Sequence, residues 1–197
     1  CHPDAWGVQI VFDNQVILGT RARKTRTKSF NAFSSIDYPE TAMFRDRRLI
    51  QFLQRPAEYT HAVFSTALDP NVFVLRLVPG MRADIIPLLE GRYRALVLES
   101  FGVGGLPGGD DGAMFAAVRD WCGAGHLAVF TTQVPHEGSD LAVYEVGRAA
   151  KALPGVLEAH DMTPEATAVK LMWVLGQTTD RAEAEKLFLT PVQWDIL

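Results

Sequence analysis

The alternation of apolar strand-like runs with helical patterns between residues 72 and 153 constrains this chain most. Residues 72–77, 95–99 and 127–130 are predicted strands, and 82–90, 111–122 and 141–153 are predicted helices. Such alternation is typical of βαβ units around a parallel sheet. Right-handed crossovers would place helices on both faces of that sheet. The sequence therefore predicts an α/β fold.

The segments on either side differ in character. Residues 8–12 and 16–18 read as a hairpin with Asp13 and Asn14 in its turn. Residues 19–39 are polar and aperiodic, which predicts a long functional loop, and 49–64 are expected to link two domains. Near the C-terminus, Thr163 is a predicted N-cap, Gly176 is expected to close that helix, and a last helix is predicted over 180–189.

Composition argues for a globular protein and against several function classes. The chain is 48% hydrophobic with a net charge of −4, and its one dense basic run, residues 21–28, is typical of a solvated loop. We therefore expect no nucleic-acid partner. No apolar run reaches the roughly 20 residues that span a bilayer, so no membrane association is predicted. Two cysteines suggest a reducing cytoplasm, with Cys122 as a buried thiol. Because residue 1 is Cys and not Met, we expect a processed, cleaved or partial chain.

Two polar turns follow predicted strands at the carboxyl edge of the sheet, where α/β proteins bind ligands. The turn 101–109 begins like a dinucleotide fingerprint, but Pro107 stands where the third glycine belongs. It is either a tight turn with positive φ or a loop that closely approaches a ligand or a neighbouring subunit, and we favour the latter. The turn 131–140 either caps a helix through Ser139 or Asp140 or hydrogen-bonds a small polar ligand.

No metal or cofactor site is predicted. The five histidines are scattered without ligand spacing, and no G-x-S-x-G motif is present. Lys24 is the residue we single out. A loop lysine is normally a solvated cation, but burial that lowers its pKa would let it transfer protons.

Several stretches in this order resemble the L-asparaginase family, in its type I (cytoplasmic) bacterial branch. They are residues 19–24 (GTRARK), 31–35 (NAFSS), 97–107 (VLESFGVGGLP), 131–133 (TTQ), 138–140 (GSD), 144–147 (YEVG) and 161–166 (DMTPEA).

The resemblance implies a two-domain organisation. Residues 1–53 would be the C-terminal piece of a larger, flavodoxin-like N-terminal domain, 54–70 a linker, and 71–197 the complete smaller α/β domain with a parallel sheet. Family chemistry is hydrolysis of L-asparagine to L-aspartate and ammonia through a threonine nucleophile and an acyl-enzyme.

Only part of the family's catalytic set is expected here. Lys24 matches the family lysine and would hold and polarise the hydroxyl of a supporting triad. The family's T-G-G-T-I and H-G-T-D-T stretches, which carry the nucleophile, the second threonine and the aspartate, have no counterpart. The chain alone is therefore expected to be inactive without the missing N-terminal segment.

Family active sites lie between protomers, which implies a homodimer or a dimer of dimers. Tyr144 would be donated to a neighbour's site, with Asp140, Gly102 and Gly104 as further substrate-binding candidates; Tyr144 could equally be a core residue. A second, regulatory asparagine site before the 131–133 turn is also a family feature. Two other functions stay open: the asparaginase-like subunit of a tRNA-dependent glutamyl amidotransferase, and a non-catalytic ligand-binding module.

Overall fold

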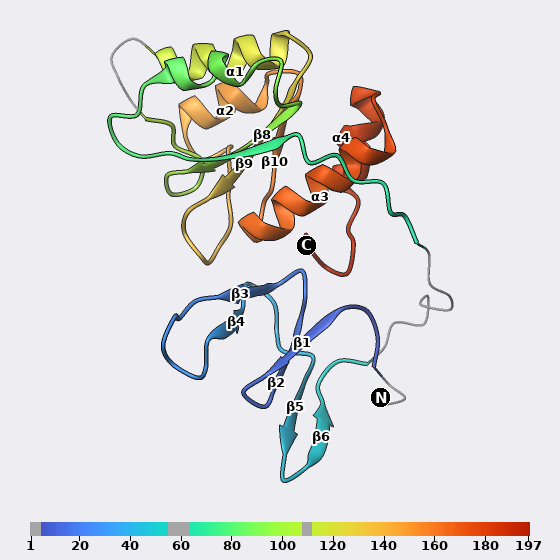
Figure 1. Ribbon diagram of the computed structural model, residues 1–197. Coiled ribbons are helices and arrows are strands. Elements are labelled where there is room, and N and C mark those ends of the chain that lie inside the picture. The colour runs from blue at the N-terminus through green and yellow to red at the C-terminus, as the bar shows by residue number, and fades with distance from the viewer. Residues whose placement is uncertain (1–4, 55–63, 108–111) are drawn as a thin grey trace.

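The computed structural model describes residues 5–54, 64–107 and 112–197, which form two lobes (Figure 1). We call residues 5–54 the N-terminal lobe and the remaining described residues the C-terminal lobe. The C-terminal lobe is a parallel sheet covered by helices, whereas every strand pair in the N-terminal lobe is antiparallel. The chain therefore has the predicted α/β fold.

The N-terminal lobe is built on the predicted hairpin. Strands β1 (Gln9–Phe12) and β2 (Gln15–Leu18) pair antiparallel, and Asp13 and Asn14 between them have φ of 49° and 61°. Two positive φ angles are what a two-residue hairpin turn of type I′ requires. Strands β5 (Ala42–Arg45) and β6 (Arg48–Gln51) complete a four-stranded sheet in the order β1-β2-β5-β6.

The prediction of an unstructured loop over residues 19–39 was wrong in part. A ribbon of two short strands, β3 (Ala22–Lys24) and β4 (Phe33–Ser35), forms within it, with Lys24 opposite Phe33. Three residues are too few for a period-two pattern to show in the sequence. The expected link over 49–64 begins as β6, and residues 55–63 lie outside the described part.

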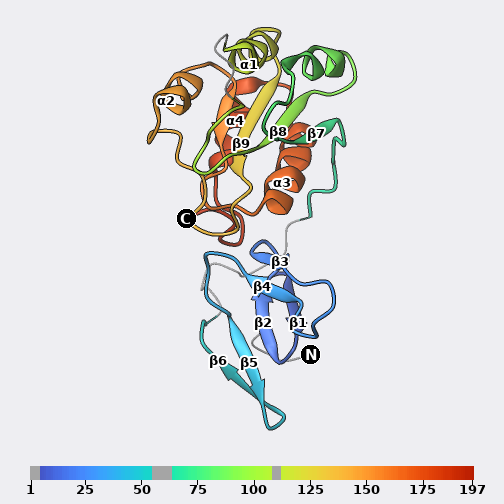
Figure 2. The same ribbon diagram turned by 90° about the vertical axis from the view of Figure 1, so that its left-hand side faces the viewer.

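The C-terminal lobe holds the predicted parallel sheet. Its strands are β7 (Val72–Arg76), β8 (Ala95–Ser100), β9 (Leu127–Thr132) and β10 (Val156–Glu158), in the order β10-β9-β8-β7. Helices α1 (Ala113–Gly123) and α2 (Glu145–Lys151) cover one face. Helices α3 (Pro164–Gln177) and α4 (Arg181–Leu189) cover the other, as Figure 2 shows from the side.

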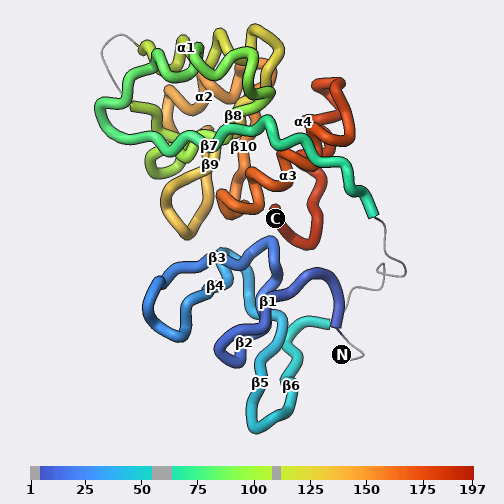
Figure 3. The backbone as a smooth tube through the Cα atoms, in the orientation of Figure 1, coloured from blue at the N-terminus to red at the C-terminus, as the bar shows by residue number. Residues whose placement is uncertain are grey.

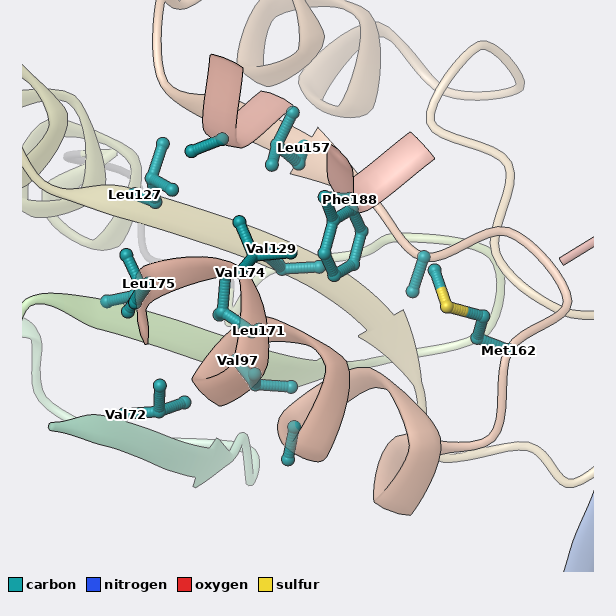
Figure 4. Packing of buried hydrophobic residues seen from close by; sticks show 14 of the residues in the cluster. Val72, Val97, Leu127, Val129, Leu157, Met162, Leu171, Val174, Leu175 and Phe188 are labelled. Carbon is teal, nitrogen blue, oxygen red and sulfur yellow. The ribbon is translucent and has the colours of Figure 1, made fainter. Parts of the chain in front are cut away.

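Alternation along each strand divides the core between the two faces. Val97 and Val129 point toward α3 and α4, where Leu171, Val174 and Phe188 pack on them (Figure 4). The intervening residues, such as Leu98 and Phe130, point the other way into the cluster under α1 and α2. Both faces are apolar because both are covered, which is why these strands read as continuous hydrophobic runs.

Several predicted helix limits need correction. The helix expected over 82–90 is two 3-10 turns, Ala83–Ile85 and Pro87–Leu89, because Pro87 cannot donate to an α-helical ladder. Helix α2 begins later than expected, and its N-cap is Tyr144, not Ser139 or Asp140. Strand β10 was not predicted. Gly176 lies inside α3 and does not end it, and a Cβ at this position would collide with the backbone of Ala67.

The predicted start of α3 is confirmed. Thr163 Oγ1 accepts a hydrogen bond from Ala166 N at 3.1 Å, and Pro164 occupies the first helical turn. Asp180 caps α4 in the same way through Glu183 N at 2.9 Å. These local side-chain bonds satisfy amides that the helix itself leaves unpaired.

Cys122 is buried in α1, as predicted, and burial raises the pKa of its thiol from 9.0 to about 11. Because the thiol of the folded protein holds its proton more tightly than that of the unfolded chain, the folded state is favoured while the thiol is protonated. Below pH 9 both states keep the proton, so this stability is fully present. As pH rises toward 11, the unfolded thiol ionises first, and stability is lost.

We expect the free energy of unfolding to fall by about 2–3 kcal/mol over this pH range through Cys122 alone. Urea denaturation at a series of pH values would measure it, with Cys1→Ser as the background. The matched variant Cys122→Ala should lose this part of the pH dependence. Equal pH slopes with and without Cys122 would contradict the assignment.

Candidate functional site

Lys24 lies on the surface of the N-terminal lobe. It is the last residue of β3, and its exposed side chain forms no hydrogen bond or ion pair with any of the described residues. An open hollow of about 680 Å³ lies beside the ribbon, lined among others by Arg26, Ser34, Tyr38 and Glu40, but Lys24 is outside its lining. This chain by itself therefore does not bury Lys24, as a role in proton transfer would require.

Arg21, three residues earlier, is fully buried between the lobes. Its Nη1 donates to the backbone oxygen of Asp161 at 2.9 Å, and its Nη2 lies 2.8 Å from Asp161 Oδ2. Its Nε donates to the backbone oxygen of Trp194, and the guanidinium lies 5.6 Å from the centre of the Tyr38 ring. A buried charge requires this degree of pairing, because an uncompensated one costs several kcal/mol.

The C-terminal turn (residues 192–195) meets Arg21 from the other lobe, and Figure 3 shows the chain end at the boundary between the lobes. Gln193 and Trp194 have φ of 49° and 54°, although neither is glycine. Left-handed backbone costs L-residues about 1–2 kcal/mol each, so the turn needs support from its surroundings. Asp195 N donates to Val192 O at 3.1 Å, and Asp195 Oδ1 accepts from Val192 N at 2.7 Å.

A buried ion pair fixes this turn to α3. Lys170 Nζ lies 2.8 Å from Asp195 Oδ2 and donates to Thr190 O at 2.8 Å. Burial lowers the pKa of Lys170, and Asp195 opposes that shift. The polar atoms of the turn then face the N-terminal lobe: Thr20 Oγ1 donates to Gln193 O at 2.9 Å, and Val8 N to Gln193 Oε1 at 3.0 Å.

A second polar contact joins the lobes near the 131–140 turn. Asp37 accepts a hydrogen bond from Glu137 N at 3.0 Å, and its other oxygen lies 3.1 Å from His136 Nδ1. These three residues come from opposite lobes, so the turn contacts its own chain and is not free for a ligand at these atoms.

The structure brings three of the predicted binding residues together. Asp140 N donates to Val103 O at 2.7 Å, which joins the 138–140 stretch to the turn containing Gly102 and Gly104. Gly102 has a φ of 50° and is exposed; Gly104 has a φ of 149° and is buried against Leu141. These angles agree with the alternative of a tight turn, and the close neighbour of Gly104 is a side chain of the same chain. The favoured alternative, approach to a ligand or a neighbouring subunit, stays a prediction.

Tyr144 is 59% exposed at the N-cap of α2, so the alternative of a core tyrosine is excluded. Asp140 Oδ1 accepts from Ala142 N at 2.9 Å and stays exposed. Within the described residues, no hydrogen bond or ion pair joins Lys24 to Tyr144, Asp140, Gly102 or Gly104.

The 131–133 stretch is occupied by internal bonds. Thr132 Oγ1 donates to Gly102 O, and Gln133 Nε2 donates to Leu77 O at 2.6 Å and to Glu99 O at 2.8 Å. These bonds hold the carboxyl ends of neighbouring strands together. Thr131 Oγ1 is buried and is without a hydrogen-bond partner among the described residues.

Sequence reasoning missed Arg21, Asp161, Glu158 and the C-terminal turn. Arg21 and Asp161 stand inside recognised stretches, but they are 140 residues apart, and no local pattern relates them. Glu158 is buried and accepts from Leu141 N at 2.7 Å, while Lys151 Nζ lies 2.8 Å from its other oxygen. A single acidic residue at the end of a three-residue strand does not indicate in the sequence that it binds these two distant groups.

Residues 71–188 match the family described as Glutaminase/Asparaginase C-terminal domain, and residues 1–58 match Asparaginase, N-terminal. The chain belongs to the asparaginase family. It is 38% identical over 182 residues to an L-asparaginase of Thermococcus kodakarensis, covering 92% of this chain and 54% of that protein. It is 33% identical to a glutamyl-tRNA(Gln) amidotransferase subunit of Metallosphaera sedula, covering 87% of this chain and 39% of that protein.

Solved structures of the family have the same fold. The thermostable L-asparaginase from Thermococcus kodakarensis superimposes with a TM-score of 0.90 at 35% identity, covering 97% of this chain and 57% of that one. L-asparaginase I from Vibrio cholerae, at 23% identity, gives 0.80, covering 96% and 56%. The chain thus spans about half the length, or less, of the relatives it matches.

Among the described residues, no group of three or more His, Cys, Asp or Glu side chains is placed to hold a metal ion. In the same part of the chain, no helix is both long and apolar enough to cross a membrane.

Leu141 packs closely against the glycine turn at Gly104 but not at Gly102. A Cβ on Gly104 would lie 2.5 Å from Leu141 Cδ2, whereas a Cβ on Gly102 would meet nothing within 4 Å. Gly104→Ala should lower the free energy of unfolding by about 3 kcal/mol, through overpacking added to an unfavourable φ. Gly102→Ala, the matched control, should cost about 1 kcal/mol. Chemical denaturation measures the free energy of unfolding of both variants. Similar decreases in the two would mean that the Leu141 side chain moves aside at little cost, which would contradict the prediction.

Proposed function

We propose that this chain is the C-terminal portion of an L-asparaginase of the type I branch, which hydrolyses the side-chain amide of L-asparagine. The observation that carries the proposal is the 38% identity to an L-asparaginase over 92% of the chain. That range includes most of the N-terminal lobe as well as the C-terminal lobe, so the likeness extends to the segment that bears Lys24.

The reaction needs a nucleophile that this chain does not supply in the family's pattern. A threonine hydroxyl of a preceding segment attacks the amide carbon, ammonia leaves, and water then releases aspartate from the acyl-enzyme. Lys24 holds and polarises the supporting hydroxyl and eases proton transfer. The chain alone is inactive on this account.

Exposed apolar side chains support a covering segment over the N-terminal lobe. Val11, Phe30 and Phe52 are all more than half exposed. A further segment packed on this lobe would remove apolar side chains of this kind from water. The missing N-terminal segment of the same protein is the occupant we propose, and it would also bury Lys24.

Other parts of the proposal concern organisation and assembly. The two family matches support a division into residues 1–53, a linker over 54–70, and a small domain over 71–197. We further propose a homodimer or a dimer of dimers in the cytoplasm. In it, Tyr144 reaches a neighbour's substrate, with Asp140, Gly102 and Gly104 shaping that surface. The exposure of Tyr144 supports this role.

A second candidate is the asparaginase-like subunit of a tRNA-dependent amidotransferase, which would pass ammonia to a partner enzyme. Its support is the 33% identity to glutamyl-tRNA(Gln) amidotransferase subunits from two organisms. A non-catalytic module that binds ligand through the small domain alone is a third candidate. Co-purification with a tRNA-binding subunit would favour the second, and calorimetric binding of L-asparagine to the isolated chain would favour the third.

The decisive experiment is ammonia release from L-asparagine by the reading frame extended upstream of Cys1, or by this chain mixed with the upstream piece. We expect activity there and none from the chain alone. No asparagine-dependent ammonia from a folded extended protein would remove the proposal.

Lys24 allows a sharper measurement in the active extended protein. Lys24→Met should lower kcat by about a hundredfold or more, because it removes a group that assists proton transfer. Lys28→Met is the matched control, since Lys28 is an exposed lysine of the same polar stretch, and it should keep the parent rate. Equal rates in the two variants would show that Lys24 has no part in the chemistry.

A further inference from the structure

We propose that Arg21 and the C-terminal turn (residues 192–195) together act as a clamp that positions Lys24. The inference rests on the proposed function, because Lys24 is the residue whose placement matters. It assigns Arg21 as a positioning residue: it touches no reacting atom and acts through the strand that carries Lys24.

Arg21 is held from both lobes at once. The guanidinium binds the backbone oxygens of Asp161 and Trp194 and pairs with Asp161 Oδ2 at 2.8 Å. A planar fork with several donors fixes direction as well as distance, which a lysine could not do. The C-terminal lobe therefore dictates where this one residue of the N-terminal lobe lies.

The backbone of Arg21 transmits that position to Lys24. Its amide donates to Leu18 O at 3.0 Å, and its carbonyl accepts from Ile36 N at 2.9 Å, so it joins the base of the β3–β4 ribbon to β2. Lys24 follows three residues later at the far end of β3. At about 3.3 Å per residue, the two Cα atoms are roughly 10 Å apart along one short strand.

The C-terminal turn is built for this contact. Its carbonyls can point at the N-terminal lobe because Gln193 and Trp194 adopt left-handed backbone, and the Lys170–Asp195 pair keeps the turn in that shape. Strained backbone that persists under such support is typical of functional segments. By contrast, Arg23 Nε lies 3.4 Å from Glu165 Oε1, whose side chain is 61% exposed, and such a pair contributes little.

The test compares Arg21→Met with Arg23→Met in the extended protein, by steady-state kinetics with L-asparagine. We expect Arg21→Met to lower kcat by about tenfold to a hundredfold, since a displacement of about 1 Å can have that effect. KM should stay close to that of the parent. Arg23→Met, the same change two residues along the same segment, should keep both constants. Unchanged kcat in Arg21→Met, with the parent active, would overturn the clamp and leave the proposed function standing.

The double variant Arg21→Met with Asp161→Leu distinguishes a loss of stability from a loss of the position of Lys24. It removes both charges, so no buried charge is left unpaired, and it should regain stability without regaining kcat. Recovery of full kcat would show that Arg21 only stabilises the protein, and the inference would fail.

Hydrogen exchange on the 197-residue chain gives a readout that needs no activity. In Arg21→Met the amides of Ile36 and Thr25, which bond within the ribbon, should exchange about tenfold faster or more, while those of β8 and β9 keep their rates. An unchanged ribbon would overturn the clamp. If the extended parent releases no ammonia, the proposed function fails, and exchange still decides whether Arg21 orders the ribbon.

Discussion

The buried guanidinium of Arg21 is the contact on which the relation between the two lobes depends. It lies at the base of the β3–β4 ribbon and meets Asp161 and Trp194, which belong to the loop before α3 and to the C-terminal turn. Removing one partner of such a buried pair typically costs about 3–5 kcal/mol, so the lobes gain a directed connection as well as apolar contact. The Trp6 ring adds to the latter, with its centre 5.3 Å from that of Trp194.

A comparable constraint organises the carboxyl edge of the parallel sheet. Leu141 is buried between the glycine turn and α2, where Gly104 and Gly147 leave room for it. Its amide is held by the carboxylate of Glu158 at the end of β10. The buried contacts of Leu141 thereby fix the loop that carries Asp140 and Tyr144, while those two side chains remain exposed. Asp140 and Tyr144 are therefore held in place on the surface of the C-terminal lobe.

Much of the fold could be predicted where packing acts locally. Strands β8 and β9 are buried on both faces, so their sequences are continuously apolar, and Thr163 with Pro164 starts α3 by a cap that involves adjacent residues only. Prediction failed where the deciding partner is distant. Gly176 looks like a helix terminator, yet it lies within α3, where the nearby backbone of Ala67 leaves no room for a side chain. For the candidate site, the sequence indicates Gly102, Gly104 and Asp140 one by one, and the structure brings them together through the Asp140–Val103 bond. Nothing in the sequence distinguishes Arg21 from the other basic residues of its polar stretch.

The sequence by itself determined the α/β class, the alternation of strands and helices that makes the sheet parallel, and the resemblance to the asparaginase family. Each of these depends on local features: the spacing of hydrophobic residues, helix caps and turn glycines. Only the tertiary structure decided that Arg21 is buried, that Tyr144 is exposed, and that Gln193 and Trp194 adopt left-handed backbone. Each of these follows from groups about 140 to 173 residues apart, or from the packing of a whole lobe. Charge burial and backbone strain are tolerated only when such distant groups supply compensating bonds, and a linear pattern does not reveal where those groups meet.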